Sequence, residues 1–336
     1  MRRPQVAIHT ARKDDLHALA IQQALEARGD VGCHIVAADR LPGSWPVGLT
    51  WSTLDSFPCV LPTTRGEPLD ARTLDLVWWR RVSAPKGPPH VQDPVQLDLI
   101  ANDCRSAVEG LLSNEFPGTW VNDPQATRLA ENKLVQLRAA ERAGFRVPLT
   151  LVSQEPEQIR RFSAMLDHKV VVKPVRGTTK GPLLTTMISE ALLDADASMR
   201  LCPATYQEYV EGKCHVRAHC FGPDVHAALI ESEAVDWRAN LDVPVRPIEL
   251  PEEARARLQR VLGLLGLRMG VVDLKLTDEG ELVWLEINPQ GQFLFVEGLC
   301  GLQLTAAFSE FLTREAMQAN ERRAAASGAS GARTDP

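Results

Sequence analysis

The sequence predicts a mixed protein in which an N-terminal α/β part is followed by α+β parts. Three patterns carry this prediction: a β-α-β opening over residues 6–37, alternating strands and helices over residues 149–174, and a hairpin over residues 270–288. The length of 336 residues corresponds to roughly two domains of about 150 residues, while three small domains or one large domain stay open. Hydrophobic residues make up 44% of the chain, which supports a sizeable core and excludes global disorder.

The charge balance limits the partners. Lys and Arg total 37 against 43 Asp and Glu, so the chain has no global basic field for nucleic acid or an anionic membrane. The apolar run Val6–Ile8 is too short for a signal peptide, and no apolar stretch reaches the roughly 18 residues that a membrane span needs. We therefore expect a cytoplasmic protein that binds neither nucleic acid nor membrane. The seven cysteines form no C-x-x-C pair, so we expect reduced thiols, no disulfide and no structural zinc.

The N-terminal residues carry the pattern of an α/β domain. A buried strand begins at Val6, a helix extends from about Asp14 to Arg28, and a second strand spans residues 33–37. The loop after the first strand lacks a G-x-G-x-x-G sequence, so a dinucleotide site is not supported. A further strand is expected at residues 74–79, and apolar residues at helical spacing predict an amphipathic helix over residues 94–112.

The rest of the chain predicts α+β units. Asp123 is a favourable N-cap with Pro124 at the first helical position, and the helical pattern continues to Gly144. The low-complexity tail, residues 321–336, is predicted to be disordered. The remaining strands are expected at 149–152, 170–174, 206–210, 215–221, 225–231, 270–276 and 281–288, and the remaining helices at 156–166 and 252–265.

Two lysines stand in apolar surroundings. Lys133 is flanked by Leu129 and Leu137 at i−4 and i+4, so its ammonium lies on the apolar stripe of its predicted helix. A lysine whose stem covers core surface is the alternative, and position alone favours it slightly. Lys173 ends a Val-Val-Val run that is typical of a strand buried on both faces. Such a lysine points either into a cleft toward an anion or to solvent, with equal weight.

A hairpin with paired carboxylates is a stronger signal. The turn chemistry of residues 277–280 predicts a hairpin in which Asp273 lies on one face of the first strand and Glu286 with Asn288 on one face of the second. The two carboxylates then lie opposite each other at about 5 Å, or diagonally at roughly 7–8 Å. Two like charges in this position are destabilising unless a cation intervenes, and these oxygen ligands suit Mg²⁺. A solvated polar face is the alternative, which the apolar neighbours Val271 and Trp284 disfavour.

A short strand over Gln207–Glu211 precedes Gly212. Backbone groups of such a segment can hydrogen-bond an adenine edge, and the carboxylate after it can accept from ribose hydroxyls. Arg217 follows six residues after Glu211, at a strand spacing that can aim its guanidinium at phosphate oxygens in the same cleft. Alone, the segment is a weak signal.

The order of these features resembles the ATP-grasp superfamily, whose members sandwich ATP between two α+β units after an N-terminal α/β domain. The residues in this order are Lys133, Lys173, Glu208–Glu211, Arg217, Asp273, Glu286 and Asn288. The resemblance implies an ATP-grasp fold. It comprises an N-terminal α/β domain at 1–118, a central subdomain at 119–204, a C-terminal subdomain with the metal-binding hairpin at 205–320, and the tail at 321–336.

Further segments are similar to the microviridin-type (graspetide) peptide-maturing ligases. They are Trp79-Arg80-Arg81, Trp120-Val121-Asn122-Asp123-Pro124, the segment KLVQL from Lys133 to Leu137, Asp236-Trp237-Arg238, and Leu285-Glu286-Ile287-Asn288-Pro289 followed by Gly291-Gln292. Phe293 and Phe295 stand where this pattern leads us to expect tryptophan. That departure bears on the packing there and leaves the metal ligands unaffected.

The resemblance implies a peptide ligase that uses ATP and Mg²⁺. Its partner is a ribosomally made precursor peptide with a leader and a core rich in Thr, Ser, Asp and Glu. An Asp or Glu side chain is activated as an acyl phosphate, and a Thr or Ser hydroxyl or a Lys amine of the same peptide closes an ester or amide macrocycle. A homodimer follows only from family analogy.

The resemblance also implies residue roles. It assigns catalysis to Lys173, Arg217 and Arg238, and metal binding to Asp273, Glu286 and Asn288. It assigns ATP binding to Lys133, Lys173, Gln207, Glu208, Tyr209, Val210, Glu211 and Arg217. For Arg238, whose planar guanidinium can grip a carboxylate or an acyl phosphate, a structural pair with Asp236 is almost equally favoured. Arg80 and Arg81 either face an acidic peptide or are solvated, and the adjoining Trp78 and Trp79 favour a function for at least one of them.

Three other functions stay open. One is an ATP-grasp ligase that joins a free amino acid to a carboxylate, against which Asp236-Trp237-Arg238 argues mildly. A second is a small-molecule kinase on the same scaffold. The third is a non-catalytic, nucleotide-gated carrier of a peptide.

Overall fold

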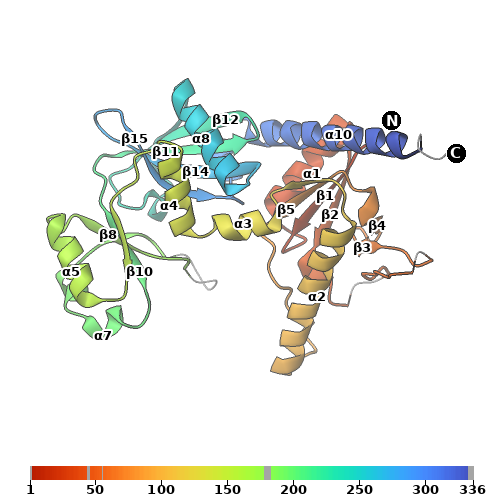
Figure 1. The fold of residues 1–336 in the computed structure, drawn as a ribbon, viewed down its shortest axis with the longest axis horizontal. Coiled ribbons are helices and arrows are strands. Elements are labelled where there is room, and N and C mark those ends of the chain that lie inside the picture. Colours follow the sequence, from red (N-terminus) through yellow and green to blue (C-terminus); the bar gives the residue numbers. More distant parts are fainter. Residues whose placement is uncertain (1, 44–45, 55, 178–182, 332–336) are drawn as a thin grey trace. The chain divides into compact units, whose positions relative to one another are not determined.

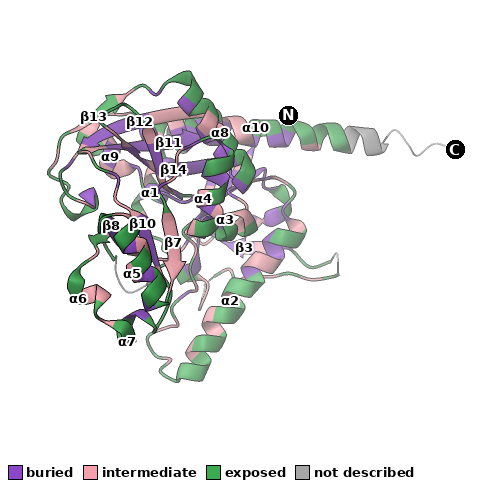
Figure 2. Ribbon diagram, turned by 60° about the vertical axis from the view of Figure 1, so that its left-hand side comes forward, coloured by how far each residue is buried: buried purple, intermediate pink, exposed green. Residues whose placement is uncertain are grey.

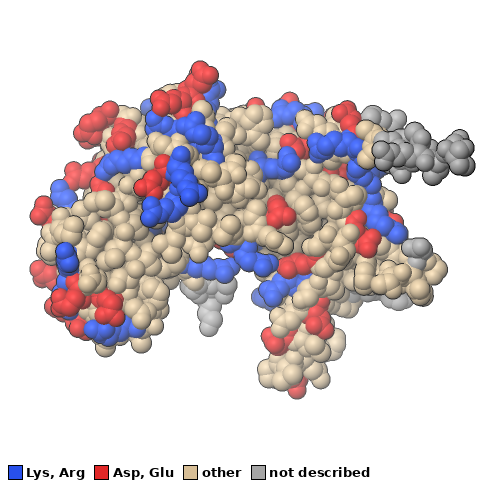
Figure 3. Space-filling view, in the orientation of Figure 1, with Lys and Arg blue, Asp and Glu red and all other residues tan. Residues whose placement is uncertain are grey.

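The computed structural model describes residues 2–43, 46–54, 56–177 and 183–331 (Figure 1). The chain forms two compact units, and the first is discontinuous in sequence. It combines Met1–Pro124 with Gln303–Pro336, whereas the second spans Gln125–Leu302. On the face drawn in Figure 3, acidic and basic side chains are interspersed rather than gathered into a field of one sign. No described helix combines the length and apolar character that crossing a membrane requires.

The first unit is built on a parallel sheet with strand order β2-β1-β5-β6. The opening β-α-β pattern is confirmed, because the Asp15 carboxylate caps the first helix and Gly29, at φ 75°, ends it. The strands are β1 Gln5–Thr10, β2 Gly32–Ala37, β5 Leu76–Arg80 and β6 Thr119–Val121, with β3 Val60–Pro62 and β4 Pro68–Asp70 in a separate pair. The helices are α1 Leu16–Arg28, α2 Pro94–Glu115 and α10 Leu304–Gly331.

Helix α10 returns to this sheet from the far end of the chain. Phe308 packs edge-on against Trp78 of β5, with ring centroids 4.8 Å apart. The fully buried Asp75 carboxylate accepts hydrogen bonds from Arg323 of α10 at 2.8 Å and from Arg2 at 2.7 Å. The helix therefore continues through residues 321–331, inside the segment that composition predicts to be disordered. Arg323 anchors it, and its alanine-rich sequence favours helix.

The second unit contains two antiparallel sheets. One has the order β7-β10-β8-β9 and the other β13-β12-β11-β14-β15. The four-stranded sheet consists of β7 Thr150–Ser153, β8 Val170–Pro174, β9 Thr186–Met187 and β10 Ala204–Glu208. The five-stranded sheet consists of β11 Cys214–Phe221, β12 Asp224–Glu231, β13 Val245–Ile248, β14 Met269–Leu276 and β15 Leu282–Asn288.

Helices bury one face of each of these sheets. Ile159 of α5 packs with Val170 and Tyr206 of the four-stranded sheet. Leu258 of α8 lies in a larger core with Trp284 of the five-stranded sheet, whose strands β11 and β14 are largely buried (Figure 2). The helices are α3 Pro124–Ala130, α4 Lys133–Arg142, α5 Pro156–Met165, α6 Glu190–Leu193, α7 Asp196–Met199, α8 Glu252–Leu265 and α9 Leu294–Cys300.

The continuous helix predicted from Asp123 to Gly144 is wrong. The chain leaves the helical path after Ala130 and re-enters it at Lys133, because the Asn132 side chain accepts a hydrogen bond from the Leu134 amide and starts a new helix. Lys133 therefore occupies the first turn of α4 rather than the middle of an apolar stripe. Leu129 is exposed, in keeping with this break.

The predicted hairpin is confirmed. Asp273 of β14 and Glu286 of β15 are direct register partners, which selects the opposed arrangement over the diagonal one. Asn288 lies opposite Val271, and a β-bulge follows Asp273. The two carboxylates therefore share one face of the sheet.

Candidate functional site

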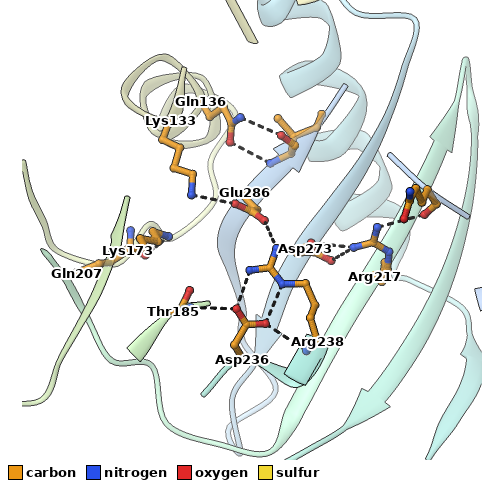
Figure 4. Close-up of polar contacts among 12 residues, drawn as sticks. Lys133, Gln136, Lys173, Thr185, Gln207, Arg217, Asp236, Arg238, Asp273 and Glu286 are labelled. Carbon is orange, nitrogen blue, oxygen red and sulfur yellow. Dashed lines mark hydrogen bonds and ion pairs between the residues drawn. The ribbon is translucent and has the colours of Figure 1, made fainter. Parts of the chain in front are cut away.

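A cleft in the second unit is lined by side chains from both of its sheets. Lys173 of β8 and Gln207 of β10 come from the four-stranded sheet, whereas Asp273 and Glu286 come from the five-stranded sheet. The connection after β12 adds Arg238. The structure thus brings together predicted site residues from positions 173 to 286 (Figure 4).

Asp273 is held by Arg217. The two residues are register partners on β14 and β11, and Arg217 Nη1 donates to both carboxylate oxygens at 2.8 and 2.9 Å. Burial raises the pKa of Asp273, and Glu286 adds to this effect, while Arg217 and Arg238 oppose it. Arg217 also lies over the rings of Trp237 and Phe295, at 5.7 and 5.4 Å, so its guanidinium has little freedom to turn.

Glu286 lies among three cations. Lys133 Nζ is 3.3 Å from Oε2 and Arg238 Nη1 is 3.5 Å from Oε1. Burial raises the pKa of Glu286, but the positive charges of Lys133, Lys173 and Arg238 outweigh it, so the pKa lies below its ordinary value. Glu286 is therefore ionised at neutral pH.

Arg238 makes two kinds of contact. Its Nε and Nη2 donate to the two Asp236 oxygens at 2.8 and 2.7 Å, and Asp236 also accepts from the Thr185 amide. The structural Asp236–Arg238 pair that competes with a functional role is therefore present. Because Arg238 also lies beside Glu286 and lines the cleft, the pair leaves the guanidinium directed at the site.

Lys173 donates to the Gln207 side-chain oxygen at 2.8 Å, and Gln207 in turn donates to Thr150. Burial lowers the pKa of Lys173 to about 8. The positive charges of Lys133 and Arg238 also lower this pKa, whereas the negative charge of Glu286 raises it. Among the described residues, no carboxylate lies within ion-pair distance of its ammonium. Of the two orientations that the sequence leaves open for Lys173, the structure shows the one that faces a cleft.

A residue that the sequence patterns did not single out ties these parts together. The buried Gln136 side chain of α4 accepts from the Ile287 amide at 3.0 Å and donates to the Ile287 and Ala130 carbonyls at 2.9 and 2.7 Å. It thereby pins α4, which carries Lys133, to β15, which carries Glu286. Two signals were available in the sequence: a polar residue one turn after Lys133, and its place in the segment KLVQL that carries part of the family resemblance.

The Gln207–Glu211 segment is partly committed to structure. The Glu208 carboxylate accepts from Arg146 and from the Leu149 amide, and the Tyr209 amide donates to Lys169. Glu211 forms an exposed ion pair with Lys169 and lines a second cavity rather than the cleft. Gln207, Glu208, Tyr209 and Val210 line the cleft.

Asn288 differs from the other two predicted metal ligands. It is exposed, and its side-chain oxygen accepts from the Gln290 amide at 2.9 Å. No cluster of three or more His, Cys, Asp and Glu side chains suited to a metal occurs in the described part of the chain. Any divalent ion would therefore rest chiefly on Asp273 and Glu286.

The arginine pair of the first unit has a different character. Arg80 is buried at the end of β5, and its Nε donates to both oxygens of Asp15, the residue that caps α1. Arg81 is exposed, with φ 44°. Arg80 is thus part of the packing of its unit.

Comparison with known proteins shows the family of the chain. No family model matches the chain. A probable alpha-L-glutamate ligase of Klebsiella pneumoniae is 30% identical over 212 residues, which cover 60% of this chain and 70% of that protein. One of Xanthomonas euvesicatoria is 29% identical, covering 66% and 77%.

The chain belongs to the ATP-grasp ligases. As a member, it is an ATP-dependent ligase of the class that joins a carboxylate to an amine or an alcohol.

Solved structures of ATP-grasp ligases share the fold. The macrocyclase MdnC of Microcystis aeruginosa, bound to its precursor peptide MdnA, superposes with a TM-score of 0.81 at 24% identity, covering 92% of this chain and 99% of that one. A RiPP-associated ATP-grasp ligase of Chryseobacterium gregarium, in complex with ADP and a leader and core peptide, gives 0.81 at 22% identity, covering 92% and 96%. PsnB, complexed with a precursor variant, Mg and ADP, gives 0.72 at 23% identity, covering 94% and 99%. The expected ATP-grasp fold is confirmed.

Proposed function

We propose that this ligase activates Asp or Glu side chains of a ribosomally made precursor peptide as acyl phosphates and closes ester or amide macrocycles within that peptide. The observation that carries the proposal is the convergence of Lys133, Lys173 and Arg238 around Glu286, next to the Arg217–Asp273 pair. Lys173, Arg238, Asp273 and Glu286 line the cleft, whereas Lys133 and Arg217 contact its carboxylates without lining it. Cations in excess of carboxylates suit a polyanionic substrate such as ATP. The similarity to ligases solved with precursor peptides supports a peptide as the second substrate.

In this proposal the cations share the work on phosphate. Lys133 and Lys173 offset charge on the nucleotide phosphates, while Arg238 holds the substrate carboxylate or the acyl phosphate. Arg217 orients Asp273, which lines the cleft. Cleft residues Gln207, Glu208, Tyr209 and Val210 surround the nucleoside. Glu211 does not line the cleft, so it is the least suited of the proposed ATP ligands.

Mg²⁺ fits the donor set only in part. Two carboxylates directly opposite each other on paired strands are the hard oxygen ligands that the ion prefers. The Asn288 side-chain oxygen uses one of its two lone pairs on the Gln290 amide, which leaves the other for the ion. Asp273, Glu286 and Asn288 would hold the ion, which when bound would offset charge on the phosphates. Lys133 and Arg238, which now contact Glu286, would then be free to bind phosphate oxygens.

The reaction balances in two steps. A carboxylate oxygen of the peptide attacks the γ-phosphorus of ATP, and ADP leaves. A hydroxyl or amine of the same peptide then attacks the acyl carbon, inorganic phosphate leaves and the nucleophile loses its proton. Each ring therefore consumes one ATP and removes the elements of one water from the peptide.

A second candidate is a ligase that adds an amino acid to a carboxylate. The relatives named as probable alpha-L-glutamate ligases favour it specifically. The chemistry of activation is the same, but the nucleophile is then a free amino acid and the substrate gains mass.

Intact mass spectrometry tests the proposal. A candidate precursor rich in Thr and Asp is incubated with the enzyme, ATP and Mg²⁺, while ADP and phosphate release are followed. We expect a loss of ~18 Da per ring with matching ADP formation. A gain equal to one amino-acid residue would establish the second candidate, and a stable phosphate adduct would establish a kinase. Tight peptide binding with no reaction would contradict both ligase proposals.

A further inference from the structure

Beyond the phosphate-binding cations, the cleft contains a buried lysine that these roles do not use. Lys275 of β14 and His215 of β11 are register partners, two residues along their strands from the Asp273–Arg217 pair. Both line the cleft, and each is only 4% exposed. Lys275 is therefore a cation built into the wall of the site rather than a surface lysine.

The contact between the two side chains fixes their roles. Lys275 Nζ lies 3.0 Å from His215 Nε2, and His215 also hydrogen-bonds the Ser232 backbone. An ammonium only donates, so Nε2 must be the acceptor. Nδ1 therefore carries the proton and donates a hydrogen bond to the Ser232 carbonyl. Burial and the charge of Lys275 lower the pKa of His215 to about 4, so the ring is neutral at physiological pH. His215 thus orients Lys275 and leaves its charge uncompensated.

No carboxylate in the described part of the chain lies within ion-pair distance of Lys275. The charge of Glu233 raises the pKa of Lys275, but from beyond ion-pair distance. A buried ammonium with one neutral partner retains donors that need an acceptor, because burying a charge without partners is costly. The cleft is where such an acceptor can enter.

The position of Lys275 along the cleft restricts which part of a bound nucleotide it can contact. A β-carbon added at Gly212 would lie 4.0 Å from Lys275 Cε, so the lysine stem runs beside the end of the Gln207–Glu211 segment. The cations proposed for the phosphates gather instead around Glu286. Lys275 therefore belongs to the nucleoside half of the cleft.

We propose that Lys275, oriented by His215, donates a hydrogen bond to a neutral lone-pair acceptor on the nucleoside of ATP. The acceptor is either a ribose hydroxyl oxygen or a ring nitrogen of the base. This inference rests on the proposed function, since it requires ATP in this cleft.

Direct binding of ATP, measured by calorimetry without peptide, tests it. Lys275→Met keeps the stem and removes the donors, and we expect affinity to fall about 10- to 100-fold, as for one hydrogen bond to a charged group. Lys213→Met, an exposed lysine outside the cleft, is the matched control and should bind as the wild type does. His215→Leu removes the acceptor that orients Lys275, so we expect this variant to bind ATP more weakly. His215→Gln keeps an acceptor and should retain most of the wild-type affinity.

Analogues identify the acceptor and do not depend on any variant folding. On the wild type, 2′-deoxy-ATP, 3′-deoxy-ATP and the 1-deaza, 3-deaza and 7-deaza analogues of ATP each lack one candidate acceptor. The analogue that lacks the true one should bind more weakly to the wild type, yet as well as ATP to Lys275→Met. Two results would overturn the inference while the proposed function stands. One is that every analogue loses as much affinity with Lys275→Met as with the wild type. The other is that Lys275→Met binds ATP as the wild type does, while Lys133→Met binds it more weakly. Absence of ATP binding by the wild type would overturn both.

Discussion

Each unit of the molecule buries arginine beside aspartate, and the two sites differ in how the charges balance. In the first unit, Arg80 meets Asp15 one to one, and Asp15 also accepts from Thr10 and caps α1. In the second unit, Lys173 and Lys275 lie in the cleft with neutral partners only, beside the paired Arg238 and Asp236. A balanced pair closed by secondary structure leaves no charge unmatched in the fold, whereas a positive surplus in a cleft is matched only when an anionic ligand arrives.

The strongest test of this contrast removes the paired carboxylates of the cleft. The double variant Asp273→Asn with Glu286→Gln preserves shape but removes both charges, and with them the residues proposed to hold Mg²⁺. Turnover, followed as ADP release, should fall about 10³-fold or more.

The matched control is Asp278→Asn, an exposed residue in the turn of the same hairpin, which should retain full activity. Unaltered turnover in the double variant, with thermal denaturation showing an intact fold, would refute the metal assignment.

The complementary test breaks the balanced pair of the first unit. Arg80→Met leaves Asp15 partly buried without its cation, so the free energy of unfolding should fall by about 3 kcal/mol or more. ATP affinity should stay at the wild-type value, because the pair lies in the other unit. Chemical denaturation and calorimetry measure the two quantities.

Arg81→Met is the control for this change, since Arg81 is exposed and should be nearly neutral. An Arg80→Met protein of normal stability that no longer binds ATP would reverse the comparison and make the first-unit site functional.

A smaller effect is expected at Gln136. Gln136→Leu leaves the Ile287 amide and two carbonyls without their partner and loosens α4 from β15. Because Lys133 and Glu286 lie on these two elements, we expect ATP affinity to fall about 10-fold, with some loss of stability. The exposed Arg138→Met on the same helix is the control. Loss of stability without loss of affinity would show that Gln136 serves the fold alone.

The sequence predicted what depends on local pattern. Alternation along 270–288 placed Asp273 and Glu286 on one face, and the helical spacing of apolar residues placed α1 and α8 closely. The break between α3 and α4 was missed because Asn132 competes with an otherwise continuous helical pattern. Contacts between distant segments, such as Gln136 with Ile287 or α10 with Trp78, leave no periodic signal. The partners of each charge in the cleft were likewise beyond the reach of spacing alone.

The mildest perturbation is pH, which changes the charge of Lys173 in the cleft without a mutation. Burial lowers the pKa of Lys173 from 10.5 to about 8, so between these values the folded chain binds fewer protons here than the unfolded chain. The contribution of Lys173 to stability is therefore least favourable below pH 8 and improves as pH rises toward 10.5. ATP affinity should move the other way, because the ammonium that we propose binds the phosphates loses its charge above pH 8.

Phosphate charge near Lys173 should raise its pKa again, so ATP binding near pH 8 to 9 should take up a proton. Calorimetry in buffers of different ionisation enthalpy measures this uptake. Lys173→Arg keeps its charge throughout this range, so it should bind ATP without proton uptake and with a flatter pH profile. Equal uptake in the wild type and Lys173→Arg would assign the titration to another group. It would then remove Lys173 from the positive surplus that distinguishes the cleft from the balanced Arg80–Asp15 pair.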